Sequence, residues 1–114
     1  MKPVKFKSQW GKEYNIVFTK STYANNNRLY IGCLCEDKEY GGYEPYCDVT
    51  VNLTRHGVLN ENCAFIDTNN ADPNLIKLMY AKDWINATGV SGGSGFCMYP
   101  MVEFTETFLK MIDT

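Results

Sequence analysis

The side chains best suited to chemistry in this sequence are five thiols and a single imidazole. The cysteines are Cys33, Cys35, Cys47, Cys63 and Cys97, and the one histidine is His56. Cys33 and Cys35 would share one face of a strand, which with His56 suggests zinc. Structural zinc sites, however, typically place about two to four residues between paired cysteines, and a catalytic thiol would need the same single histidine. We therefore expect thiols packed in the core, and neither a metal site nor a cofactor.

A second candidate is the polar segment from Asp67 to Asp72, whose side chains offer the oxygen ligands that a hard cation requires. The segment lacks the glycine and the distant glutamate of an EF-hand loop. Asp and Asn are also turn formers, and Asp72 before Pro73 is a strong N-terminal helix cap. These features favour a strand-to-helix corner over a cation site.

The glycine-rich segment GVSGGSG, residues 89–95, resembles a phosphate-binding loop in composition. Phosphate-binding loops normally lie between a strand and a helix N-terminus, whereas this segment is expected to precede a strand. It is therefore predicted to be a flexible linker or a lid. The alternative to protein binding is a small-ligand or enzymatic pocket that combines this segment, including Gly95, with Asp67, Asn69 and Asn70.

Residues 36–48 combine negative charge with tyrosine. The acidic residues are Glu36, Asp37, Glu39, Glu44 and Asp48, and the tyrosines among them are Tyr40, Tyr43 and Tyr46. Tyrosine is favoured at protein interfaces, and an acidic surface would suit a basic partner protein. The same rings could instead cover the core beside a hairpin, and the sequence leaves both interpretations open. RNA stacking on such rings would require a positive groove, so we expect no direct nucleic-acid binding.

Composition sets the limits for these candidates. The 114 residues are 45% hydrophobic and carry a net charge of −2, which predicts one domain, residues 1–114, with a substantial core and no basic field. No apolar run has the length of a signal peptide or a membrane span, so no membrane contact is expected. The odd number of cysteines favours reduced thiols and a cytoplasmic location.

Hydrophobic patterning predicts the elements that position these residues. Strands are expected over residues 2–8, 14–24, 28–37, 46–53, 63–66 and 96–104, with a hairpin turn at 25–27. A helix should begin at Asp72 and end near Trp84–Asn86, and Thr105 should cap a short C-terminal helix. Pro100 predicts an edge strand or a bulge, and an edge would permit a homodimer. The predicted fold is α+β: a mostly antiparallel sheet of about five or six strands, one main helix and a short C-terminal helix.

Three motifs in order, GGYEPYCDVTVNL, CAFIDTNN and GFCMYPMVEF, carry a family resemblance. Over roughly residues 28–105 the chain resembles short bacterial proteins of unknown function that are carried by phages and conjugative elements of gut Firmicutes. The motif residues that are candidates for a shared surface are Tyr43, Asn52, Asp67, Asn69, Asn70, Gly95 and Tyr99. The resemblance implies a mobile-element setting, in which small acidic proteins often inhibit host defence, as anti-CRISPR and anti-restriction proteins do. The net charge of −2 confines any imitation of phosphate charge to a local patch.

Together these observations predict an accessory protein that acts by binding another protein, such as a CRISPR effector or another defence nuclease. The predicted contact residues are Glu36, Asp37, Glu39, Tyr40, Tyr43, Glu44 and Tyr46. No catalytic residues are predicted, although the ligand-pocket alternative leaves an enzymatic activity open.

Overall fold

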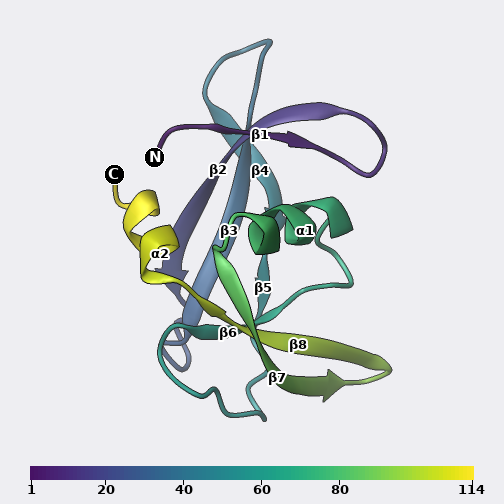
Figure 1. Cartoon of the computed structure of the whole chain (residues 1–114), viewed down its shortest axis with the longest axis vertical. Helices are drawn as coiled ribbons and strands as arrows, with labels where there is room; N and C mark the ends of the chain where they lie inside the picture. The colour runs from purple at the N-terminus through teal and green to yellow at the C-terminus, as the bar shows by residue number, and fades with distance from the viewer.

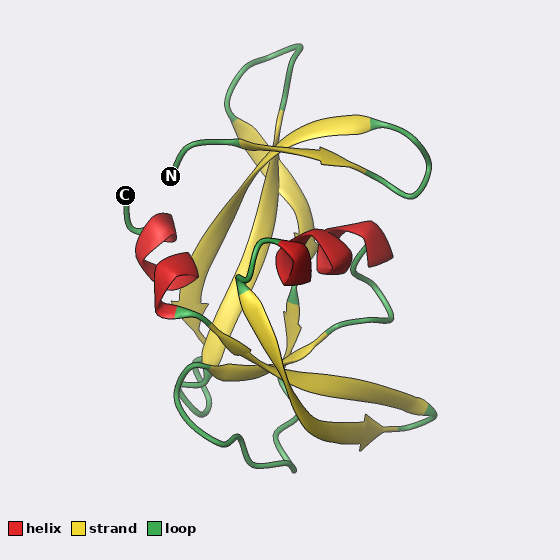
Figure 2. Ribbon diagram, viewed as in Figure 1, coloured by secondary structure: helices red, strands yellow, loops and turns green.

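The computed structural model describes all residues 1–114 and contains two four-stranded antiparallel sheets and two helices (Figures 1 and 2). The first sheet has the order β1 (Val4–Lys7), β2 (Glu13–Thr22), β3 (Leu29–Glu36), β4 (Tyr43–Asp48). The second has the order β5 (Thr50–Val51), β6 (Cys63–Ile66), β8 (Cys97–Phe104), β7 (Ile85–Ser94). The helices are α1 (Pro73–Ala81) and α2 (Glu106–Ile112), and neither is long and apolar enough to cross a membrane. The α+β class and the antiparallel pairing are confirmed, but eight strands in two sheets replace the predicted five or six.

One cause of the difference is that the predicted strand 46–53 changes sheet in its middle. The Val49 N–H donates to the Ile31 carbonyl of β3 at 2.9 Å, and the Val49 carbonyl accepts from the Asp67 N–H at 2.9 Å. Thr50 then pairs with Ile66 of β6. The alternation of apolar and polar residue types continues through this switch, although Val49 and Thr50 are both buried, so the sequence pattern alone shows a single strand.

The glycine-rich segment is not the predicted linker or lid, because residues 85–94 form β7 and pair with β8. α1 also ends earlier than predicted, at Ala81, since Asp83 adopts a left-handed φ of 57° that cannot continue a helix. Gly92 is required by close packing. A Cβ there would lie 2.8 Å from Leu53 Cδ1 and 2.9 Å from Phe65 Cε1.

The strand that contains Pro100 is central in its sheet, between β6 and β7. The predicted edge position is therefore wrong, which removes the basis on which a homodimer through that edge was predicted. The alternative prediction was a bulge, and the structure has one on the neighbouring strand. The β7–β8 register shifts between Ala87 and Ser91, and Ser91 lies opposite Pro100. On the other side, β6 pairing ends at Phe65 opposite Met101, one residue short of Pro100. The ladder thus tolerates the missing N–H because pairing is interrupted or absent at this position.

The core lies between the sheets and the helices, and α2 closes one end of it. The Phe108 side chain is fully buried, with ring centroids 5.1 Å from Phe18, 5.5 Å from Trp84 and 5.6 Å from Phe104. The predicted cap at Thr105 is confirmed, because its side chain accepts from the Phe108 N–H at 3.3 Å. These contacts join both sheets to one helix.

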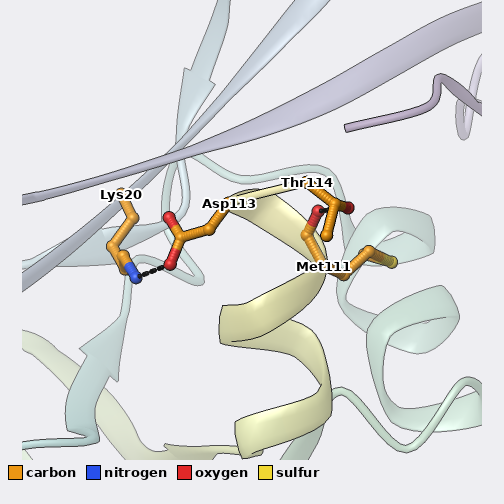
Figure 3. Close-up of polar contacts among 4 residues, drawn as sticks. All are labelled: Lys20, Met111, Asp113 and Thr114. Carbon is orange, nitrogen blue, oxygen red and sulfur yellow. Dashed lines mark hydrogen bonds and ion pairs between the residues drawn. The ribbon is translucent and has the colours of Figure 1, made fainter.

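The end of α2 is fastened to β2 by a charged pair (Figure 3). Lys20 Nζ lies 2.8 Å from Asp113 Oδ2, and the Thr114 hydroxyl donates to the Met111 carbonyl at 2.9 Å. Both side chains of the pair are partly exposed, so the pair orients the helix more than it stabilises it.

Replacing Phe108 by Ala should lower the free energy of unfolding by about 3–5 kcal/mol, because it leaves a cavity between three aromatic rings. Phe96→Ala is the matched control, since Phe96 is fully exposed at the β7–β8 turn, and should change stability by less than about 0.5 kcal/mol. Urea denaturation measures both. Equal losses in the two variants would contradict this description of the core.

Candidate functional site

The predicted contact residues lie on the hairpin formed by β3 and β4, whose loop lies at one end of the molecule (Figure 1). Asp37 organises the loop: its N–H donates to the Gly42 carbonyl at 2.9 Å, and its Oδ1 accepts from the N–H groups of Glu39 and Tyr40. Gly41 and Gly42 take the positive φ values that the turn needs. Asp37 therefore fixes the conformation of the loop, and one of its carboxylate oxygens already accepts hydrogen bonds from backbone N–H groups.

The other acidic residues of the hairpin are exposed and have no cationic partner. The two salt bridges of the chain are Lys20–Asp113 and Lys110–Glu106, both distant in sequence from residues 36–46. Glu36 accepts a hydrogen bond from the Asn15 amide at 2.9 Å. Tyr40 and Tyr43 are 84% and 43% exposed. The hairpin thus presents aromatic rings among carboxylates that form no salt bridge.

Tyr46 differs from the other predicted contact residues. It is half-buried, and its ring centroid lies 4.9 Å from that of Tyr14 and 5.9 Å from that of Phe6. Burial raises the pKa of Tyr46 to about 12, and the Asp72 carboxylate adds to the shift. The structure therefore places Tyr46 beneath the hairpin, where it supports the strand, and leaves Tyr40 and Tyr43 as the accessible rings.

A cavity of about 250 Å³ adjoins the hairpin and also involves the first hairpin of the chain. Its lining residues are Lys12, Glu13, Tyr14, Cys35, Glu36, Asp37, Lys38, Glu39 and Glu44. Five of these carry carboxylates and two carry ammonium groups, and Lys12 Nζ lies 5.1 Å from the centre of the Tyr14 ring. The contribution of residues 12–14 was missed from the sequence, although the predicted hairpin of β2 and β3 places the start of β2 beside the end of β3.

The turn after β6 is confirmed as a strand-to-helix corner. Asp67 is buried and accepts from the Asn70 N–H at 3.2 Å and from the Asn70 side-chain amide at 2.9 Å. Asp72 accepts from the Asn74 N–H at 2.8 Å, as a cap should, and from the Gln9 N–H at 3.0 Å. No group of three or more His, Cys, Asp or Glu side chains could hold a metal ion. The oxygens of this corner thus serve the turn and the helix.

Gly95 lies elsewhere, at the rim of a cavity of about 290 Å³. That cavity is lined by residues 52–56 and 93–95, and its histidine is held by a 3.0 Å contact between His56 Nε2 and the Gly93 carbonyl. Asp67, Asn69 and Asn70 do not line it. The structure therefore does not bring the two halves of the alternative ligand site into one cavity.

Two other motif residues, Asn52 and Tyr99, make contacts within the protein. The Asn52 amide donates to Asn25 Oδ1 at 3.1 Å and its oxygen accepts from Asn26 at 3.1 Å, which fastens the β2–β3 loop to the chain after β5. Tyr99 is buried in a small cluster with Leu53 and Phe65. These hydrogen bonds and this packing account for an asparagine at position 52 and a tyrosine at position 99 without a bound ligand.

The five cysteines are free thiols. The prediction of core-packed thiols is confirmed for Cys33, Cys35 and Cys63, whereas Cys47 and Cys97 are only partly buried.

The model of one protein family matches residues 18–114, and its description is domain of unknown function (DUF4313). The chain belongs to this family. The DUF4313 match begins within β2 and includes the β3–β4 hairpin and the whole second sheet, while β1 and residues 12–14 of the hairpin cavity precede it. No curated protein and no solved structure matches the chain.

Asp67→Ala should lower the free energy of unfolding by about 1–3 kcal/mol, because two hydrogen bonds of a buried turn are lost. Asn69→Ala, at an exposed position of the same turn, should change it by less than about 0.5 kcal/mol. Urea denaturation tests the pair. If Ca²⁺ or Mg²⁺ raised the melting temperature of the wild type but not of Asn69→Ala, the turn would be a cation site and this account would be wrong.

The placement of Tyr46 predicts a loss of stability at high pH. Its pKa is about 12 in the folded protein against 10 for an ordinary tyrosine, so the folded state holds the phenol proton more tightly. The resulting stabilisation is complete below pH 10 and is lost as the pH rises through about 12. In an ultraviolet titration of the folded protein, Tyr46→Phe should show one tyrosine ionisation fewer near pH 12 than the wild type does. A transition lost near pH 10 instead would show that Tyr46 is accessible.

Proposed function

We propose that the protein acts by binding a basic surface of another protein through the β3–β4 hairpin, and that its partner is a host-defence nuclease such as a CRISPR effector. The observation that carries this proposal is the hairpin itself, with exposed Tyr40 and Tyr43 among carboxylates that form no ion pair. Tyrosine is enriched among the residues that contribute most to protein interfaces. The proposal therefore rests on exposure and charge together.

Unpaired carboxylates favour such binding energetically. No intramolecular ion pair has to be broken before Glu39 or Glu44 meets a lysine or arginine of the partner, and a negative patch accelerates the approach of a basic surface. The adjoining cavity is lined by five carboxylates and two ammonium groups, and this excess of negative charge favours a cationic side chain from the partner. The tyrosine rings add rigid contact area with a polar end.

The mobile-element setting and the inhibition of defence come from the resemblance of the three sequence motifs. Nucleases that act on DNA carry positively charged channels, because phosphate contacts dominate their affinity. An acidic, tyrosine-bearing hairpin could occupy such a channel and exclude the substrate. The partner would thus be recognised by its nucleic-acid-binding surface.

The test is DNA cleavage by purified CRISPR effectors and restriction nucleases in the presence of the protein. The wild type should inhibit at least one enzyme, and Glu39→Lys/Glu44→Lys should weaken that inhibition by roughly tenfold or more, because attraction becomes repulsion at two exposed sites. Asp37 is left intact in this variant because it holds the loop. Glu61→Lys/Glu106→Lys is the control, with the same change in net charge at exposed positions outside the hairpin. It also removes the Lys110–Glu106 pair, which is exposed and therefore contributes little to stability.

Three results decide the proposal. Inhibition that is lost only in the hairpin variant, with thermal unfolding nearly unchanged, would support it, as would weaker inhibition at high salt. Equal loss in both variants would show a dependence on overall charge. Inhibition of none of the enzymes, or undiminished inhibition by the hairpin variant, would contradict the proposal.

A further inference from the structure

The β3–β4 ladder places two thiols directly opposite one another. Cys33 pairs with Cys47, whereas the other cysteines with ladder partners in these sheets face different residues: Cys35 faces Glu44, Cys63 faces Glu103 and Cys97 faces Ser94. Directly opposed residues of antiparallel strands have Cα atoms about 4.5–5.5 Å apart, within the range that a disulfide spans. Cys33 is buried in the core cluster and Cys47 packs against the same cluster, so both side chains lie on one face of the sheet.

The two thiols differ in accessibility and in acidity. Cys33 is 1% exposed, while Cys47 is only partly buried. The neighbouring Cys33 thiol lowers the pKa of Cys47, whereas the interaction with Cys47, together with burial, raises the pKa of Cys33. The Cys33 Sγ itself donates to the Leu34 carbonyl at 3.9 Å. A thiolate is the reactive form of cysteine, so Cys47 is the thiol that an oxidant meets first.

From this geometry we propose that Cys33 and Cys47 form a redox-active dithiol that a low-molecular-weight disulfide oxidises to a cross-strand disulfide. The Cys47 thiolate attacks one sulfur of the small disulfide, whose S–S bond breaks, and one small thiol leaves with the proton that Cys47 gave up. Cys33 then attacks the Cys47 sulfur, the mixed disulfide breaks, and the second small thiol leaves with the Cys33 proton. Two protein thiols are oxidised and one small disulfide is reduced to two thiols.

The position of the pair gives the bond a structural consequence. β4 is an edge strand held only by β3, and the register shifts between Cys33 and Leu34, so the strand can adjust to a cross-link. The chain between the two cysteines, residues 34–46, contains the hairpin loop and all of the predicted contact residues from Glu36 to Tyr46. Oxidation would tie the base of that hairpin, whatever the hairpin binds.

The experiment treats the full-length protein with oxidised glutathione, alkylates the remaining thiols and analyses tryptic peptides without reduction. The wild type should take two fewer alkyl groups and link peptide 29–38 to peptide 39–55. Fragmentation between Cys33 and Cys35 locates the bond in the wild type, which keeps the test independent of whether any variant folds. Thermal unfolding should shift upward by several degrees on oxidation and return with a reductant, because the cross-link restricts the unfolded chain.

Two variants separate the proposed pair from its neighbour. Cys35→Ala should keep the link, whereas Cys33→Ala should lose it and leave Cys47 as a mixed disulfide with glutathione. A bond to Cys35, a link that persists in Cys33→Ala, or a wild type that stays reduced or stops at the mixed disulfide would overturn the proposal.

Discussion

The passage of the chain from one sheet to the other at Val49 and Thr50 is the constraint on which the rest of the structure depends. Val49 is fully buried, and its N–H and carbonyl bond to backbone on opposite sides, to β3 and to the residue after β6. The Thr50 hydroxyl then accepts from the Ile31 N–H at 3.2 Å and bonds to the Tyr23 hydroxyl at 2.9 Å. A side-chain oxygen thus replaces the ladder acceptor where β3–β4 pairing ends, so the sheets can diverge without leaving a buried N–H unpaired.

This junction also determines what the hairpin can do. It fixes β3 and β4 at the end next to the second sheet, so that their connecting loop lies at the far end of the molecule (Figure 1). The free edge of β4 carries Glu44, Pro45 and Asp48, and charges and proline at an edge discourage pairing with another strand. A partner at this end would therefore meet side chains, among them the exposed tyrosines and the carboxylates without a salt bridge, and not a free strand edge.

The parts of the structure that the sequence predicted are those decided by local chemistry. Asp72 and Thr105 cap helices because a side-chain oxygen reaches backbone only two or three residues away. The β2–β3 hairpin follows from alternation and from Asn27, which takes a positive φ. The acidic hairpin residues could likewise be found from composition, since their exposure follows from charge.

What the sequence did not predict depends on partners distant along the chain. The glycines of β7 have the composition of a flexible segment, but Gly92 is required by the close approach of Phe65 from β6 and of Leu53 from the chain after β5. Pro100 is tolerated in a central strand only because pairing on both sides is interrupted there. Tyr46 has the same residue type as Tyr40, and only the position of Tyr14 and Phe6 beneath it separates a supporting ring from an accessible one.

Hydrogen–deuterium exchange of the full-length protein with a purified nuclease that it inhibits tests most directly whether the β3–β4 hairpin is the binding surface. If it is, we expect the partner to slow amide exchange in residues 36–46 and to leave residues 52–56 and 93–95, around the other cavity, unchanged. Slowed exchange around that cavity, with the hairpin exchanging as in the free protein, would contradict this expectation.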